Sequence, residues 1–323
     1  MNYNILITSA GQRVSLVRAF QKELKLFDQN AKVYTVDFNP TLAPACHVSD
    51  GYRIVKKVTD SNYIQDLIAI CKELKVKLLI PTIDTELLVL AKHKHLFLEQ
   101  GIIPIVSSNE FITICRDKRI TNDFFLQNNI DVPRAIDKEK PTFPLYIKPY
   151  DGSLSFDTFL IKSASDLRPY HFENEKLMFM EYIDHDNYDE YTVDTYYDKN
   201  GLLKSIVPRK RITVRAGEVS KGVTQRNEIV ACIKENLHHI EGAIGCLTMQ
   251  FFFNPINKRI IGIEINPRFG GGYPLSYLAG ANYPKFLIEE YLLGEEIDFF
   301  DNWEDNLLML RYDDEILVRN YIG

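Results

Sequence analysis

The sequence lacks several features that would define a protein class at once. No apolar run among its 323 residues approaches the roughly 20 residues that a membrane span requires. Its 38 lysines and arginines stand against 44 acidic residues, a net charge of −6, so no basic excess exists to neutralise nucleic-acid phosphates. The start of the chain has neither the charge nor the apolar stretch of a secretory signal. We therefore expect a soluble protein with no membrane or nucleic-acid partner.

Cysteine is also sparse. The five cysteines are odd in number and scattered, and no two form a CxxC pair, which excludes a disulfide framework and a zinc-ribbon type of site. Reduced thiols of this kind predict a cytoplasmic location. The composition, 46% hydrophobic and 25% charged, is that of an ordinary globular protein, and the length suits roughly two domains.

The glycines of a dinucleotide fingerprint are missing as well. A predicted strand at Ile5–Thr8 leads through a small-residue turn into a helix, a geometry whose free backbone N–H groups can hold an anion. The turn contains Gly11 alone, whereas the fingerprint needs three glycines at fixed spacing. Asp37, at the end of the second strand, stands where a nicotinamide enzyme has its ribose-binding acid, but one acid at a strand end is weak support for that class. A nicotinamide-dependent oxidoreductase is therefore a disfavoured alternative.

What the first hundred residues do contain is alternation between strand-like and helix-like patterns, typical of a doubly wound parallel sheet. We predict this α/β domain over residues 1–110. The expected strands are Asn4–Thr8, Val33–Asp37, Lys77–Pro81 and Ile103–Val106, and the expected helices are Val14–Phe27, Ser61–Leu74 and Asp84–Glu99.

Two further regions follow, which we predict to be a small subdomain at residues 111–183 and a larger one at residues 184–323. A helix at Arg116–Asn128 opens the first, and helices near the C-terminus end the second. The expected elements between them are strands at Leu145–Lys148, Thr158–Ile161 and Leu177–Tyr182, a β-rich stretch at Tyr191–Pro208, a helix at Asn227–Ile244, and a strand pair at Leu247–Phe253 and Arg259–Asn266.

Two segments have polar residues directly after predicted strands. Lys148 leaves an apolar strand and enters a Gly/Ser loop, an arrangement that suits a phosphate site because it combines one cation with hydroxyls and accessible amides. The segment Thr82–Glu86 follows another buried strand. For that segment we favour a structural role, in which Thr82 or Asp84 caps the next helix and Glu86 complements its dipole.

The strongest local signal is the polar face of the last strand pair. Side chains alternate along a strand, so the apolar odd positions from Leu247 to Ile265 form a core face, while Gln250, Glu264 and Asn266 share the other. These three oxygen donors are what Mg²⁺ selects. Arg268 follows on the same side and suits a transferred phosphoryl group. We predict a metal–phosphate site here.

The order of these segments resembles the ATP-grasp superfamily, in particular short proteins similar to the large subunit of carbamoyl-phosphate synthase. The resemblance spans almost the whole chain and implies a doubly wound α/β domain followed by two α+β subdomains that grip ATP. The segments that carry it are Asp117-Lys118, Ile147-Lys148-Pro149 with its loop, Met180-Glu181-Tyr182-Ile183, Asp189–Asp194, and Gln250 with Glu264-Ile265-Asn266-Pro267-Arg268.

The resemblance also implies roles for individual residues. Lys118, Lys148 and the loop serines Ser153 and Ser155 would hold ATP phosphates, Glu181, Tyr182 and Ile183 would read adenine, and Glu190 would bind the ribose. Gln250, Glu264 and Asn266 would hold one or two Mg²⁺ ions, replaceable by Mn²⁺, and Arg268 would steady the γ-phosphoryl group. The implied reaction activates a carboxylate as an acyl phosphate for attack by an amine or related nucleophile. The alternative is an ATP-binding module without chemistry, and a homodimer is left open.

A basic segment at residues 208–222 remains. It holds five cations and one acid in a protein of negative net charge. Strand alternation would direct Arg211 and Arg215 to one face, and in similar ligases this stretch faces the γ-phosphate. We expect Arg211 or Arg215 to bind the carboxylate of the acceptor substrate.

Overall fold

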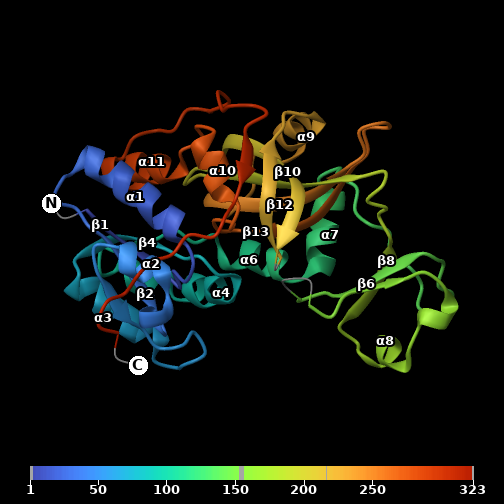
Figure 1. Ribbon diagram of the computed structural model, residues 1–323, viewed down its shortest axis with the longest axis horizontal. Helices are drawn as coiled ribbons and strands as arrows, with labels where there is room; N and C mark the ends of the chain where they lie inside the picture. Colours follow the sequence, from blue (N-terminus) through green and yellow to red (C-terminus); the bar gives the residue numbers. More distant parts are fainter. Residues whose placement is uncertain (1–2, 153–155, 216, 322–323) are drawn as a thin grey trace.

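The computed structural model describes residues 3–152, 156–215 and 217–321, and its N-terminal part is the predicted α/β domain (Figure 1). Five parallel strands lie in the order β3-β2-β1-β4-β5, so β1 stands where the connections change direction. The strands are β1 Asn4–Thr8, β2 Val33–Asp37, β3 Tyr52–Ile54, β4 Val76–Ile80 and β5 Ile103–Pro104. The helices are α1 Val14–Phe27, η1 Pro40–Leu42, α2 Pro44–Val48, α3 Tyr63–Glu73, α4 Asp84–Lys92 and α5 Lys94–Leu98.

A small sheet follows at the far end of the molecule from this domain (Figure 1). Its three antiparallel strands lie in the order β7-β6-β8. Its elements are β6 Leu145–Pro149, β7 Phe159–Ile161, η2 Ala164–Asp166, α8 Pro169–Glu173 and β8 Leu177–Glu181. Apolar side chains of β6, β7 and β8 form a small core of their own, so this sheet is stabilised independently.

The centre of the molecule is an antiparallel sheet of six strands in the order β13-β12-β9-β10-β11-β14. The strands are β9 Asp189–Tyr197, β10 Leu203–Arg215, β11 Glu218–Thr224, β12 Gly245–Phe253, β13 Ile260–Asn266 and β14 Leu308–Leu310. The helices around it are α6 Asn109–Arg116, α7 Lys118–Gln127, α9 Glu228–Asn236, α10 Tyr273–Leu278, α11 Tyr283–Ile288 and η3 Glu289–Leu293. Helix α7 packs so closely on β13 that Gly262 has no room for a Cβ beside the Phe125 ring.

The α/β domain and the six-stranded sheet share one hydrophobic core. Phe20 of α1 packs edge-on against Phe269, with ring centroids 5.8 Å apart, and the same cluster contains Tyr273, Tyr283 and Trp303. Burial of large aromatic side chains is among the strongest stabilising contributions in a protein. The two parts are therefore held in a fixed relation, and the turn after β1 has a fixed position over the sheet.

The mixed α/β class, the parallel sheet and the later antiparallel sheets confirm the predicted fold, whereas several element boundaries were wrong. The predicted helix at Asp84–Glu99 breaks at His93, and the one at Asn227–Ile244 ends at Asn236. The segment after η3 is extended and adds β14 to the sheet, so the described chain does not end in helices. The domain boundaries at residues 110 and 183 stay a prediction. None of the helices in the described part of the chain has the length and apolar character to cross a membrane.

A buried ion pair lies at the middle of the six-stranded sheet. Asp194 accepts hydrogen bonds from Arg209 Nε and Nη2 at 2.7 and 3.1 Å, and the two side chains are 0% and 1% exposed. The same carboxylate accepts from the hydroxyls of Thr248 and Ser276. One carboxylate therefore connects β9, β10, β12 and α10.

Removing the charge of Asp194 is expected to destabilise the fold. Asp194→Asn leaves the Arg209 guanidinium buried without a counter-charge, which costs about 3–5 kcal/mol. The matched control is Asp313→Asn, because Asp313 pairs with Arg215 at the surface, where both side chains are at least 70% exposed. Solvent screens this exposed pair, so its loss should change the stability little. The free energy of unfolding in urea measures both, and equal losses would contradict the assignment.

Candidate active site

A cavity of about 830 Å³ lies among the three parts of the molecule, and we call it the central cavity. Its walls come from the turns after β1 and β4, from the small sheet, and from the polar face of the six-stranded sheet. Most of the predicted site residues line it. They are Lys118, Lys148, Glu181, Tyr182, Ile183, Glu190, Arg211, Gln250, Glu264, Asn266 and Arg268. Ser153 and Ser155 lie outside the described residues.

The predicted metal ligands are neighbours on β12 and β13. Gln250 pairs with Glu264 and Thr248 with Asn266, and Asn266 Nδ2 donates to Glu264 Oε1 at 2.9 Å. Near the turn an odd position pairs with an even one, Phe253 with Ile260, whereas the shared polar face requires even positions to pair with even ones. A bulge at Ile263 corrects the offset.

This bulge changes the face on which one side chain lies. The alternation predicted that Ile263 would belong to the core, but the extra residue turns it into the central cavity instead. Because of the same bulge, the polar side chains of β12 and β13 lie directly opposite each other. The predicted polar face is therefore present.

The two predicted phosphate-binding lysines approach this polar face from different elements. Lys118 begins α7 and lies 3.8 Å from Glu264 Oε2, while its ammonium also donates to the carbonyl of Gly152. Lys148 leaves β6, where burial lowers the pKa of its ammonium to about 8; Glu264 opposes that shift and Lys118 adds to it. Two cations and the acid of the polar face therefore share one space.

The predicted adenine and ribose residues line the same cavity, but the carboxylates of Glu181 and Glu190 already have partners in the protein. Glu181 accepts from the backbone N–H and the guanidinium of Arg134, and also from Arg259 at 3.3 Å. Glu190 lies 3.3 Å from Arg211. The side chain of Glu181 thus has a structural role, and Tyr182 and Ile183 line the cavity beside it.

Arg215 does not lie where the sequence predicted. Register shifts between Arg211 and Val214 interrupt the alternation along β10, so Arg211 lines the cavity and Arg215 does not. The guanidinium of Arg215 pairs at the surface with Asp313. The prediction that both arginines share one face was therefore wrong, because strand alternation holds only while the register is regular.

The structural role favoured for Thr82–Glu86 is only partly correct: Glu86 lies in the first turn of α4, but neither Thr82 nor Asp84 caps the helix. Asp84 forms a two-pronged ion pair with Arg268, at 3.1 and 2.6 Å, across the central cavity. Helix α4 has no side-chain cap, and Thr82 donates instead to the carbonyls of Thr8 and Ser9. Asp84 follows β4 at the carboxyl edge of the parallel sheet, where α/β domains bind ligands, and that position was the available signal.

Two further residues of the cavity were missed. Arg13, in the turn after β1, lies 3.4 Å from Glu218 of β11, and both line the central cavity. Burial lowers the pKa of Arg13, and Glu218 opposes this shift. The pair joins segments that are far apart in the sequence, so no local pattern could indicate it.

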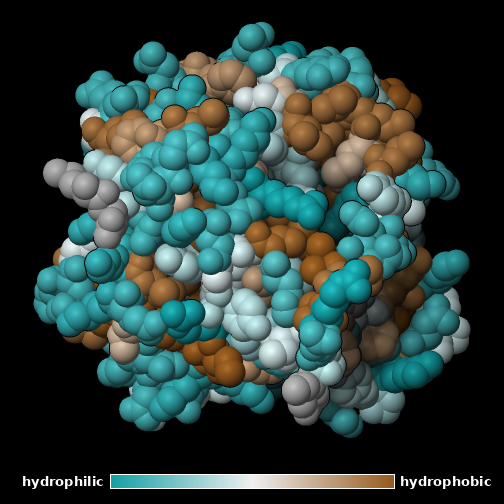
Figure 2. All heavy atoms as spheres, turned by 60° about the vertical axis from the view of Figure 1, so that its left-hand side comes forward, coloured by the Kyte–Doolittle hydropathy of each residue, from teal (hydrophilic) through white to brown (hydrophobic). Residues whose placement is uncertain are grey.

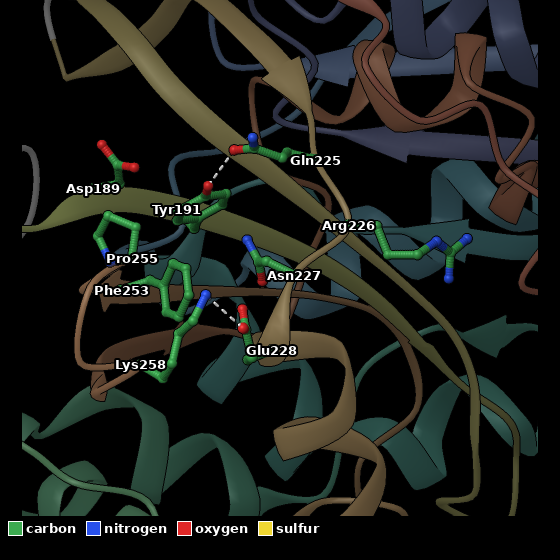
Figure 3. A pocket seen from close by; sticks show the side chains of 9 residues that line it. All are labelled: Asp189, Tyr191, Gln225, Arg226, Asn227, Glu228, Phe253, Pro255 and Lys258. Carbon is green, nitrogen blue, oxygen red and sulfur yellow. Dashed lines mark hydrogen bonds and ion pairs between the residues drawn. The ribbon is translucent and has the colours of Figure 1, made fainter.

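A second hollow, of about 560 Å³, opens where β9 and β12 meet the start of α9 (Figure 3). Its charged groups are already neutralised: Lys258 lies 2.8 Å from Glu228, and Asp189 lies 2.8 Å from Lys210. The hydroxyl of Tyr191 donates to Gln225. The central cavity has the greater volume and brings most of the predicted site residues together, so it is the candidate active site.

The comparisons with known proteins agree with this geometry. Residues 5–105 match the family model described as PylC-like, N-terminal domain, and residues 173–309 match ATP-grasp in the biosynthetic pathway with Ter operon. No curated protein sequence matches the chain significantly.

Solved structures are similar over almost the whole chain. Biotin carboxylase from Campylobacter jejuni is 15% identical with a TM-score of 0.72, covering 95% of this chain and 74% of that one. N5-carboxyaminoimidazole synthetase from Staphylococcus aureus, solved with ADP, is 15% identical with a TM-score of 0.68, covering 96% and 81%. Rhizobium etli pyruvate carboxylase is 14% identical with a TM-score of 0.70; the match covers 92% of this chain and only 29% of that one.

The α/β domain, the small sheet and the six-stranded sheet around one cavity are thus an ATP-grasp fold. Residues 173–309 match an ATP-grasp family model and the fold is that of these solved structures over almost the whole chain, in agreement with the resemblance that the motifs predicted.

The lowered pKa of Lys148 generates a pH prediction. A bound triphosphate favours the protonated lysine, so ATP binding takes up a proton once free Lys148 is neutral. The dissociation constant for ATP should therefore rise as the pH rises through about 8, by at most about tenfold per pH unit. Calorimetric titration measures this dependence.

Two controls accompany this titration. Lys148→Arg keeps its charge at every pH used and should remove the dependence, because a guanidinium does not titrate in this range. Adenosine, which has no phosphate, should bind with the same affinity throughout. An ATP affinity that stays constant across pH 8 in the unaltered protein would show that Lys148 does not contact the phosphates.

Proposed function

We propose that this protein is an ATP- and Mg²⁺-dependent ligase that activates a carboxylate as an acyl phosphate, which an amine or related nucleophile then attacks. The observation that carries the proposal is the meeting of Gln250, Glu264 and Asn266 with Lys118 and Lys148 in one cavity. Phosphoryl transfer needs positioning and charge neutralisation more than covalent help. This set of side chains supplies both.

The donor set fits a hard cation that arrives with a nucleotide. In the part of the chain that the structure describes, no three His, Cys, Asp or Glu side chains cluster to hold a metal by themselves. One carboxylate and two amides are oxygen ligands suited to Mg²⁺ or Mn²⁺, which take further ligands from substrate phosphates. Glu264 and Asn266, with Gln250 opposite, would hold the ion, which neutralises charge on the transferred phosphoryl group.

The other side chains then have assigned tasks. Lys118 and Lys148 bind the phosphates, Arg268 steadies the γ-phosphoryl group, and the backbone of Glu181–Ile183 reads adenine. Glu190 binds ribose hydroxyls. Arg211, beside Glu190, binds the carboxylate substrate, since a carboxylate next to a triphosphate needs a cation to offset like-charge repulsion. The small sheet covers the cavity and keeps water away from the acyl phosphate, because water would hydrolyse this intermediate.

The second candidate is an ATP-binding module without chemistry. The presence of Gln250, Glu264, Asn266 and Arg268 together in the cavity disfavours it, because nucleotide binding alone needs fewer such groups. A nicotinamide oxidoreductase is disfavoured by the turn after β1, where the N–H of Gly11 is already bonded to Asp37. Thermal-shift titrations with ATP plus Mg²⁺, with AMP and with NAD separate the three, because the preferred ligand raises the midpoint most.

Glu264→Gln should abolish turnover while the protein stays folded, because the exchange removes a metal-binding charge from the polar face and leaves the core face intact. The measurement uses a panel of carboxylic acids with ATP, Mg²⁺ and hydroxylamine, which traps an acyl phosphate as a hydroxamate. The melting midpoint provides the folding control. Near-normal hydroxamate formation in the variant would refute the metal assignment, and none from any acid in the unaltered protein would refute the ligase function.

Arg211 and Arg215 provide a matched pair of variants. Arg211→Ala should raise the KM for the carboxylate at least about tenfold, equivalent to roughly 1.4 kcal/mol, with the KM for ATP little changed. Arg215→Ala should leave both constants unchanged, because its side chain is 70% exposed and pairs with Asp313. Loss of ATP affinity alone in Arg211→Ala would assign the residue to the nucleotide.

The remaining predictions concern partners and location. Small carboxylates and amines are the expected partners, and a homodimer and a cytoplasmic location stay predictions. Hydrophobic residues on the face in Figure 2 form several patches separated by hydrophilic ones. Light scattering across a range of protein concentrations tests the dimer.

A further inference from the structure

The side chain of Arg268 reaches from the six-stranded sheet to the α/β domain. Arg268 follows β13 by two residues, and its Nε and Nη2 donate to the two carboxylate oxygens of Asp84 at 3.1 and 2.6 Å. Asp84 begins α4 in the other part of the molecule. The side chains of Arg268 and Asp84 are 15% and 20% exposed, and both line the central cavity. The pair is therefore largely sheltered from water but still open to a ligand in the cavity.

The bonds to Asp84 decide which donors of Arg268 stay free. A guanidinium has five N–H groups in one plane. Two of them donate to Asp84, and a third, on Nη1, donates to the carbonyl of Phe269 at 3.3 Å. The other two, one on Nη1 and one on Nη2, have no partner among the described residues. Because the group is planar, the direction of these two free N–H groups is set by the side on which Asp84 binds.

Asp84 also supplies the main counter-charge of Arg268. Burial lowers the pKa of the Arg268 guanidinium, but Asp84, with a smaller contribution from Glu264, raises this pKa above its ordinary value overall. Breaking a sheltered ion pair by removing one partner leaves the other charge uncompensated. Without the carboxylate of Asp84, Arg268 would therefore turn toward another acid of the cavity.

The turn that carries Asp84 is anchored on both sides. Thr82 donates from its hydroxyl to the carbonyls of Thr8 and Ser9 at 2.9 and 2.8 Å. The hydroxyl of Ser9 donates in turn to the carboxyl group of Glu86 at 3.0 Å. Thr82 and Glu86 are both 0% exposed. The carboxylate of Asp84 is thus presented from a rigid edge of the parallel sheet.

The backbone of Arg268 is fixed as well. Its carbonyl accepts from the hydroxyl of Thr248 at 3.0 Å, and three glycines, residues 270–272, follow one residue later as the glycine loop. A Cβ at the first of these glycines would lie 2.9 Å from Thr248 Oγ1, and one at the second would lie 2.3 Å from the carboxyl group of Glu218. Since the backbone has so little room to move, the orientation of the guanidinium depends on Asp84.

We propose that Asp84 is a positioning residue for phosphoryl transfer: by binding Nε and Nη2 of Arg268, it directs the two free N–H groups toward the γ-phosphoryl group. In this step a carboxylate oxygen of the substrate bonds to the γ-phosphorus while the bond from that phosphorus to the β,γ-bridging oxygen breaks, and ADP leaves with the electron pair. Fixed donors aimed at the transferred group stabilise its charge without reorganisation. The inference rests on the ligase function proposed above, and it gives the α/β domain a part in the chemistry.

The experiment uses the carboxylic acid that forms hydroxamate fastest. Asp84→Asn keeps the shape of the side chain but removes the charge, so kcat should fall about ten- to a hundredfold while the KM for ATP changes less than about twofold. Arg268→Met, which removes the donors themselves, should lower kcat at least as much. Glu73→Gln is the matched control in the same domain, because Glu73 pairs with Arg53 at the surface, and it should leave kcat unchanged.

The double variant separates positioning from a structural role. If Asp84 acts through Arg268, Asp84→Asn should cost nothing further in the Arg268→Met background, whereas independent roles give losses that multiply. Calorimetry gives a readout without turnover. ADP with Mg²⁺ and aluminium fluoride, which imitates the transferred group, should bind at least about tenfold more weakly to Asp84→Asn, and ADP with Mg²⁺ alone should bind equally. All assays are run below the melting midpoint of the least stable variant.

The outcomes separate the two proposals. An unchanged kcat in Asp84→Asn, losses that multiply in the double variant, or equal weakening of ADP with and without aluminium fluoride would mean that Asp84 only joins α4 to the six-stranded sheet. Each of these results would overturn this inference while the ligase function stands. Absence of hydroxamate from every acid in the unaltered protein would overturn the ligase function and the inference with it.

Discussion

The buried pair of Asp194 and Arg209 is the interaction on which the rest of the site depends. Arg209 lies under the glycine loop, and Asp194 fixes its guanidinium through two hydrogen bonds. Thr248, which bonds to Asp194, also donates to the carbonyl of Arg268. The positions of Arg268, of the loop and of Glu218 therefore follow from one ion pair that is removed from water. Such a pair contributes little net stability compared with an apolar core, but it imposes one geometry because neither partner tolerates the loss of the other.

Charges in the central cavity are arranged as opposite pairs contributed by different segments. Lys118 lies near Glu264, Arg211 near Glu190, Arg268 near Asp84, and Arg13 near Glu218. Each pair keeps a half-buried charge from being uncompensated in the free protein. A polyanionic ligand has to replace one partner in several pairs, so its affinity is a difference between two sets of interactions. This exchange favours ligands that satisfy both members of a pair.

The sequence predicted the parts of the fold that depend on local pattern. The succession of strand-like and helix-like segments located the parallel sheet. Alternation of apolar and polar residues located the polar face with Gln250 and Glu264, because a strand buried on one side has apolar residues at every second position. Arg215 and Ile263 were misplaced because one extra residue in a strand reverses the faces beyond it, and composition does not show where a bulge occurs. The ion pairs of Asp84 and Glu218 were not foreseen because their partners are distant in the chain. Strand β14 was missed because it has only three residues on a sheet edge, two of them exposed, which is too short to show an alternation.

The separate core of the small sheet has a consequence for how the molecule opens. Helix α1 and the C-terminal helices share one apolar cluster, so moving the α/β domain away from the six-stranded sheet would expose aromatic rings to water. The small sheet carries its apolar residues within itself and can swing without that cost. Lys148 travels with it, while Glu264 stays with the six-stranded sheet. A nucleotide that contacts both lysine and glutamate would therefore add a connection between the small sheet and the six-stranded sheet that apolar packing does not supply.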